Sequence, residues 1–117
     1  MFQTDYRLEV KKRDWLLMVR PFGEIDHHSA VNMREELDRI ILKERPRRLV
    51  LDLSCIEFMD SAGLGLLMGR YRLMRELGGV LAITRPNARV LKILHLAGME
   101  RFMEIEGEGA KGEGKNG

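Results

Sequence analysis

The stretch that decides the fold is Leu49-Val50-Leu51-Asp52-Leu53, followed closely by Phe58-Met59-Asp60-Ser61-Ala62-Gly63-Leu64-Gly65. The first part is a short apolar run typical of a buried strand. After the second part, apolar residues recur at helical spacing at Leu67, Met74 and Leu77. Asp60 and Ser61 are therefore predicted to lie where a strand leads into a helix.

Ser61 is a candidate phosphorylation site because of this position. The first turn of a helix has N–H groups without partners inside the helix and carries the positive end of the helix dipole. A phosphate on Ser61 would meet those groups rather than an apolar core. The alternative is that Asp60 and Ser61 only cap the helix, since both residue types are favoured there.

The bulk composition indicates one small domain without a nucleic-acid, membrane, metal or cofactor site. The chain has 117 residues, a net charge of +2 and basic residues that are spread along it. Its longest apolar run, Trp15 to Val19, is far too short for a membrane span. Cys55 is the single cysteine, which excludes an internal disulfide and favours a cytoplasmic location. His27 and His28 are adjacent and do not face one another, so we expect no metal site.

The first half of the chain predicts two strands and a helix. Tyr6 to Val10 alternates and suits a one-sided strand, while Trp15 to Val19 suits a strand buried on both faces. Pro21 and Gly23 are expected to break that strand. Asp26 then caps a helix that ends before Pro46. The residues expected to face inward on this helix are Val31, Met33, Leu37, Ile40 and Ile41.

The second half predicts an alternation of strands and helices. The expected elements are a strand at Leu49–Leu53, a helix from about Ala62 to Leu77, a strand at Val80–Ile83, a helix from Arg85-Pro86-Asn87 to Gly98, and a short edge strand at Phe102–Ile105. This order predicts an α/β fold, a small mixed sheet of four to five strands with helices packed against it. The loops Gly23–His28 and Ser54–Ser61 should then share one edge of the sheet. Residues 107–117 carry no large apolar side chain and are predicted to be disordered.

Two segments together resemble a known family. Gly23-Glu24-Ile25-Asp26-His27-His28-Ser29-Ala30 and Phe58 to Gly65, with Gly69-Arg70-Tyr71 further on, resemble the anti-sigma factor antagonists, which are single STAS domains. The similarity is greatest to the sporulation branch of that family and runs from about Arg7 to Ile105. It implies a STAS domain over residues 1–106.

The resemblance implies a transcription regulator that works by partner switching and has no enzymatic activity. The unphosphorylated protein would bind an anti-sigma factor serine kinase and so release the sigma factor. Phosphorylation on Ser61 would end the complex, and a serine phosphatase would restore it. The free protein is expected to be a monomer. The residues expected at the partner-binding surface are Asp26, His27, Asp60, Ser61, Ala62, Gly63, Leu64 and Gly65.

Two features differ from the family pattern, and two other functions remain open. Ala62 stands where close relatives often have a second serine, and the Gly/Glu/Lys tail replaces a final helix. A STAS domain could also act as a scaffold in stress signalling or as a subunit of a lipid-transport complex. A hydrolase that uses Ser61 is disfavoured, because a nucleophile elbow requires glycine where Met59 stands.

Overall fold

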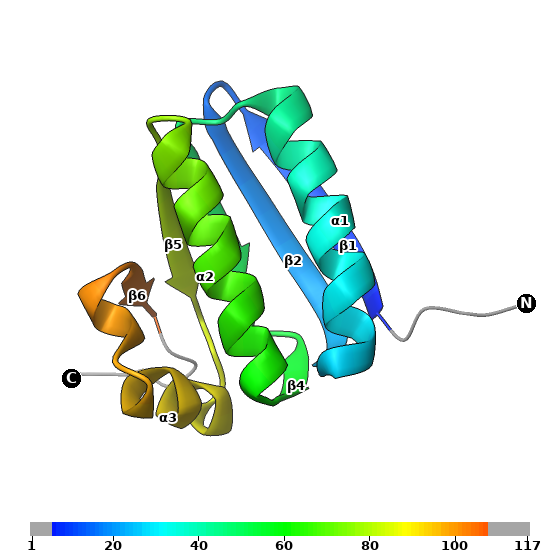
Figure 1. The fold of residues 1–117 in the computed structure, drawn as a ribbon, viewed down its shortest axis with the longest axis vertical. Coiled ribbons are helices and arrows are strands. Elements are labelled where there is room, and N and C mark those ends of the chain that lie inside the picture. The colour runs from blue at the N-terminus through cyan, green and yellow to red at the C-terminus, as the bar shows by residue number, and fades with distance from the viewer. Residues whose placement is uncertain (1–5, 108–117) are drawn as a thin grey trace, which may run out of the picture.

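The computed structural model describes residues 6–107 as one mixed sheet with helices (Figure 1). The elements in chain order are β1 (Tyr6–Arg13), β2 (Leu16–Ile25), α1 (His27–Glu44), β3 (Arg48–Asp52), β4 (Ile56–Met59), α2 (Ser61–Glu76), β5 (Val80–Thr84), α3 (Ala88–Leu96), a short 3-10 helix (Met99–Arg101) and β6 (Glu104–Glu106). The predicted disordered tail lies outside the described residues, apart from Gly107.

The sheet has six strands in the order β1-β2-β3-β5-β6, and β4 pairs with β2 beyond the end of β3. β1 is antiparallel to β2, and the remaining pairs are parallel. The predicted mixed α/β architecture is confirmed. The sheet has more strands than expected because Ile56–Met59 is a strand inside the segment that was expected to be a loop. It is only four residues long and buries only Ile56 and Met59, which left a weak sequence signal.

β2 continues through Pro21 and Gly23, so the predicted break there is wrong. β2 pairs with β3 from Leu16 to Val19, and its pairing with β4 begins only at Gly23. Pro21 falls between these two parallel partners, so its missing N–H removes no bond to β3 or β4, and on its other side it pairs with Leu8 of β1. Gly23 has φ of 114° and marks a shift in register, a backbone conformation that suits glycine.

α1 and α2 lie on the same face of the sheet (Figure 1). The side chains of β2 therefore alternate: Leu17 and Val19 are buried, whereas Leu16 and Met18 are only half-buried. The prediction of a strand buried on both faces is wrong for this reason, and Trp15 lies in the turn with 61% of its surface exposed.

The helices begin and end close to their predicted positions. α1 buries Met33, Leu37 and Ile41, as expected, but Val31 is 52% exposed rather than inward-facing. After α1, Arg45 takes a left-handed conformation just before Pro46. α3 begins at Ala88, slightly later than predicted, because Asn87 is its cap: the Asn87 Oδ1 accepts from the Val90 N–H at 2.8 Å.

A buried ion pair joins the two main helices. Arg70 on α2 is only 6% exposed, and its Nε lies 2.9 Å from the Asp38 Oδ1 on α1. Burial lowers the pKa of Arg70, and the charge of Asp38 opposes that shift. The pair fixes the two helices beside one another, and removing one partner would leave a buried charge uncompensated.

Gly63 is required by packing, and Gly69 offers a matched control. A Cβ on Gly63 would lie 2.2 Å from the Met59 Cγ and 3.2 Å from the Ile25 Cγ2, whereas one on Gly69 would meet open space. We expect Gly63→Ala to lower the free energy of unfolding by about 1–3 kcal/mol through overpacking. Gly69→Ala should raise it by about 0.5–1 kcal/mol through helix propensity. Urea unfolding followed by circular dichroism measures both, and a Gly63→Ala variant as stable as Gly69→Ala would contradict this packing argument.

Candidate functional site

β2 and β4 end side by side and place two helix starts at one edge of the sheet. Ile25 pairs with Met59 in the parallel register, and the Asp60 N–H donates to the Ile25 carbonyl at 3.1 Å. The next residue on each strand is the N-cap of a helix, Asp26 for α1 and Asp60 for α2. The expectation that the two loops share one edge is therefore confirmed.

Asp26 holds the start of α1 by a reciprocal capping box. Its Oδ1 accepts from the N–H groups of His28 at 2.9 Å and Ser29 at 3.0 Å, and the Ser29 Oγ accepts from the Asp26 N–H at 3.1 Å. The N–H of Ser29, together with that of His28, lowers the pKa of Asp26. The His27 and His28 rings are exposed, with centroids 4.0 Å apart, at the surface of this first turn.

Asp60, and not Ser61, caps α2. The Asp60 Oδ1 accepts from the Ala62 N–H at 2.8 Å, and Ser61 is the first residue of the helix. Ser61 is exposed, and within residues 6–107 its hydroxyl has no hydrogen-bond partner in the protein. The capping interpretation therefore applies to Asp60 alone, and the Ser61 hydroxyl is open to solvent.

A shallow groove runs between α1 and α2 next to these helix starts. It has a volume of about 210 Å³, and its lining residues are Ala30, Val31, Arg34, Ala62, Gly65 and Leu66. Three of them are alanine or glycine, which leaves the two helices separated at the surface. The exposed Val31 gives the groove an apolar wall, and Arg34 adds a positive charge.

The residues predicted for partner binding have different environments. Asp26, Asp60 and Ala62 are partly exposed, and His27, Ser61 and Gly65 are exposed. Leu64 is half-buried against the core. Gly63 is buried against Met59 and Ile25, so its contacts are internal.

Sequence reasoning missed the α1 side of the groove. Val31 was assigned to the core, and Ala30 and Arg34 had no assigned role. The available signal was the position of Val31, which lies two residues before Met33 and so outside the regular spacing of the buried residues Met33, Leu37 and Ile41. Its meaning depended on where α2 packs, which the sequence of α1 does not contain.

Carboxylates surround the Ser61 edge. Glu24 and Asp26 come from the end of β2, and Glu57 and Asp60 come from β4 and the residue after it. Glu24 pairs with Phe58 in the register of β2 and β4, so the four residues belong to neighbouring strand ends. A further negative charge on Ser61 would add to an edge that is already acidic.

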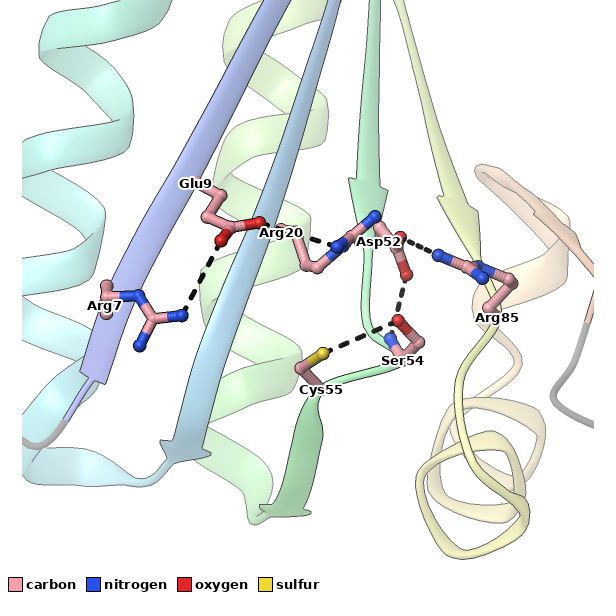
Figure 2. Close-up of polar contacts among 7 residues, drawn as sticks. All are labelled: Arg7, Glu9, Arg20, Asp52, Ser54, Cys55 and Arg85. Carbon is pink, nitrogen blue, oxygen red and sulfur yellow. Dashed lines mark hydrogen bonds and ion pairs between the residues drawn. The ribbon is translucent and has the colours of Figure 1, made fainter.

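A buried carboxylate on the opposite face of the sheet shapes the segment before β4 (Figure 2). Asp52 lies at the end of β3 and is only 1% exposed. Its Oδ2 lies 3.1 Å from the Arg20 Nε and also forms an ion pair with Arg85. Its Oδ1 also accepts from the Ser54 N–H at 2.9 Å, which shapes the turn into β4. Asp52 is thus a positioning residue for β4 and, through it, for Ser61.

The network around Asp52 continues to the edge of the sheet. The Arg20 Nη1 also lies 3.5 Å from the Glu9 Oε1, and the Glu9 Oε2 lies 3.6 Å from the Arg7 Nη2 (Figure 2). Burial by itself raises the pKa of Asp52, but the Arg85 guanidinium and the Ser54 N–H outweigh it, so the pKa is lowered. Asp52 is the single charged residue of the apolar run Leu49–Leu53, and this was the sequence signal for the site.

Residues 6–107 contain no cluster of metal ligands and no membrane-spanning helix. No group of three histidine, cysteine, aspartate or glutamate residues there could hold a metal ion. None of the helices in this part of the chain has both the length and the apolar character that crossing a bilayer requires.

The chain belongs to the STAS domain family, whose pattern matches residues 7–109. It is 35% identical over 99 residues to the anti-sigma F factor antagonist of Paenibacillus polymyxa, with 85% of each chain covered. It is 31% identical over 107 residues to the anti-sigma-B factor antagonist of Bacillus subtilis, covering 92% of this chain and 94% of the relative. The unphosphorylated anti-sigma factor antagonist SpoIIAA has a similar structure, with a TM-score of 0.74, 25% identity, and 88% and 90% of the two chains covered. These findings confirm the resemblance and the single-domain fold.

Asp52→Asn tests the positioning role. The variant keeps an acceptor for the Ser54 N–H but loses the charge that pairs with Arg20 and Arg85, so we expect a loss of about 1–3 kcal/mol of folding stability at neutral pH. The lowered pKa of Asp52 means that its contribution is complete above about pH 4, its ordinary range, and is lost as pH falls through the folded-state pKa.

The difference between wild type and Asp52→Asn should therefore shrink in acid. Thermal or urea unfolding of both proteins, from neutral pH into acid, measures this stability difference. Glu9→Gln, an exposed member of the same network, is the control and should change stability by less than about 1 kcal/mol. A stability difference that is independent of pH would contradict the role of the Asp52 charge.

Proposed function

We propose that this chain is an anti-sigma factor antagonist that is switched by phosphorylation on Ser61. The unphosphorylated form binds an anti-sigma factor serine kinase and releases a sigma factor, and phosphorylation by that kinase ends the complex. The observation that carries the proposal is that Asp60 caps α2, which leaves the Ser61 hydroxyl exposed beside the Asp26 cap of α1. The names of the relatives support the antagonist role.

The contact surface in this proposal is the edge formed by the two helix starts. It includes Asp26, His27, Asp60, Ser61, Ala62, Leu64 and Gly65, with the groove wall of Val31 and Arg34 added. Gly63 contributes through the packing that it allows. The groove accepts an apolar side chain of the kinase over Ala62 and Gly65, and such packed, water-excluded centres dominate the energetics of interfaces.

The charge of a phosphate is sufficient for the switch without refolding. Phosphorylation adds about −1.5 to −2 charges at neutral pH. In the free chain, water and the α2 N-terminus stabilise these charges, whereas a tight interface removes the water and places them near Asp26 and Asp60. Desolvating an unpaired charge costs several kcal/mol. A loss of about 3–6 kcal/mol weakens binding by roughly two to four decades.

We extend the proposal to the remaining parts of the switch. A serine phosphatase removes the phosphate and restores binding, the free protein is a monomer in the cytoplasm, and the regulated program is sporulation or a general stress response. This chain has no catalytic step of its own in the scheme.

The first test is incubation with ATP and the candidate anti-sigma factor kinase from the same genome. We expect the intact mass to show a gain of one phosphate, mapping to Ser61, together with loss of the complex in a pull-down. Ser61→Ala should bind the kinase and stay bound when ATP is added. Ser61→Asp should weaken binding only in part, because one carboxylate has less charge and fewer oxygens than a phosphate.

Ser54→Ala is the matched control. Ser54 is the other exposed serine among residues 6–107, and it lies in the turn before β4. This variant should accept phosphate on Ser61 and leave the complex as wild type does. Phosphorylation at another residue, or a complex that survives phosphorylation of Ser61, would refute the switch.

Gly65→Ala tests the groove separately from the phosphate. A Cβ on Gly65 meets nothing within 4 Å in the free chain. We expect Gly65→Ala to raise the stability of the free domain by about 0.5–1 kcal/mol through helix propensity. It should also weaken kinase binding, because the added methyl group fills the groove.

Gly69→Ala controls for stability alone. It adds the same group one helical turn away, outside the groove lining, and should stabilise the chain to a similar degree while leaving the affinity unchanged. Calorimetric titration of both variants with the kinase measures the difference. Equal affinities for the two variants would exclude the groove from the interface.

A further inference from the structure

The end of the domain opposite Ser61 is strongly cationic. The turns β1–β2, α1–β3 and α2–β5 lie together at the upper end of Figure 1, and the starts of α1 and α2 lie at the lower end. The upper end includes residues 11–15, Lys-Lys-Arg-Asp-Trp, and residues 43–47, Lys-Glu-Arg-Pro-Arg. These two segments contain six cations and only two carboxylates.

Two contacts hold these segments together. The Arg47 N–H donates to the Trp15 carbonyl at 2.9 Å, and the Lys12 Nζ lies 2.8 Å from the Glu44 Oε1. Glu44 therefore neutralises Lys12. Within residues 6–107, the other five cations of these segments have no carboxylate at ion-pair distance. All five are exposed: Lys11, Arg13, Lys43, Arg45 and Arg47.

Trp15 lies within this cationic surface and is 61% exposed. It is the only tryptophan of the chain, and its ring is not part of the core. An exposed tryptophan ring among cations suits a partner that is both apolar and negatively charged. A bilayer surface with acidic lipids has both properties, since tryptophan favours the headgroup level and lysine and arginine are attracted to the anionic leaflet.

We propose that the surface formed by Lys11, Arg13, Trp15, Lys43, Arg45 and Arg47 binds peripherally to anionic lipid bilayers. A nucleic-acid surface is less consistent with the observations, because sequence-tolerant binding of single strands uses several stacking rings along a groove. Here a single ring lies at a hairpin turn. The carboxyl ends of α1 and α2 carry partial negative charge at this end, which Lys43 and Arg45 offset beside α1.

This contact sets an orientation. With Trp15 at the headgroups, the acidic edge formed by Glu24, Asp26, Glu57 and Asp60 faces away from the membrane, and Ser61 stays accessible to a protein partner. The contact involves none of the residues of the Ser61 surface, so the lipid-binding proposal is independent of the proposed phosphorylation switch. It also departs from the sequence-based expectation of no membrane partner, which relied on the absence of an apolar run long enough to span a bilayer.

The test uses the emission of Trp15 as a direct probe. The full chain is titrated with vesicles of phosphatidylcholine alone and with vesicles of phosphatidylcholine and phosphatidylglycerol in equal parts. We expect a blue shift of the emission only with the anionic vesicles, with partitioning at least about tenfold above that on neutral vesicles at low salt. High salt should reverse it, because the attraction is screened.

Charge-reversal variants locate the contact. Lys11→Glu combined with Arg47→Glu should reduce partitioning by at least about tenfold. Arg89→Glu combined with Lys92→Glu makes the same change of net charge on exposed residues of α3 and should retain binding. Circular dichroism establishes that both variants are folded, and vesicle sedimentation gives a second readout.

Three outcomes would overturn the inference. The first is no emission shift with anionic vesicles, or an equal shift with neutral ones. The second is equal loss of binding in the two double variants, which would indicate net charge rather than this surface. The third is a stronger response to single-stranded nucleic acid than to anionic vesicles at equal phosphate concentration, which would assign the surface to nucleic acid.

Discussion

The parallel pairing of β4 with the end of β2 is the constraint on which the rest of the structure depends. β2 is longer than β3, so its last residues need another partner, and Ile56–Met59 supplies it. Because Ile25 and Met59 share a register, Asp26 and Asp60 leave the sheet side by side and each caps a helix. Two helix starts with matching caps at one edge make a surface that no single segment could form.

Packing between these elements separates residues that look alike in sequence. The glycines of α2 follow one another at short intervals, but only Gly63 presses against the core, where Met59 and Ile25 leave no room for a Cβ. Gly65 lies over the groove between α1 and α2 and meets nothing in the free chain. The first serves the fold, and the second leaves space that a partner can use.

The two faces of the sheet and the two ends of the domain differ in chemistry. α1 and α2 cover one face with an apolar core, and the other face carries the ion pairs around Asp52 (Figure 2). One end has the carboxylates near Ser61, and the other has the cations near Trp15. The small net charge of +2 conceals this separation, because opposite charges at the two ends cancel in the sum.

The sequence by itself determined the order of the elements other than β4, the start of α1 at Asp26 and the strand-to-helix position of Asp60 and Ser61, because these depend on local periodicity and on residues such as Asp26, Asp60 and Pro46. It also carried the family resemblance. Only the tertiary structure decided that Pro21 lies inside β2, that Val31 borders a groove, and that Arg47 lies beside Trp15. Each of these depends on contacts between segments far apart in the chain, and local patterns contain no information about such partners.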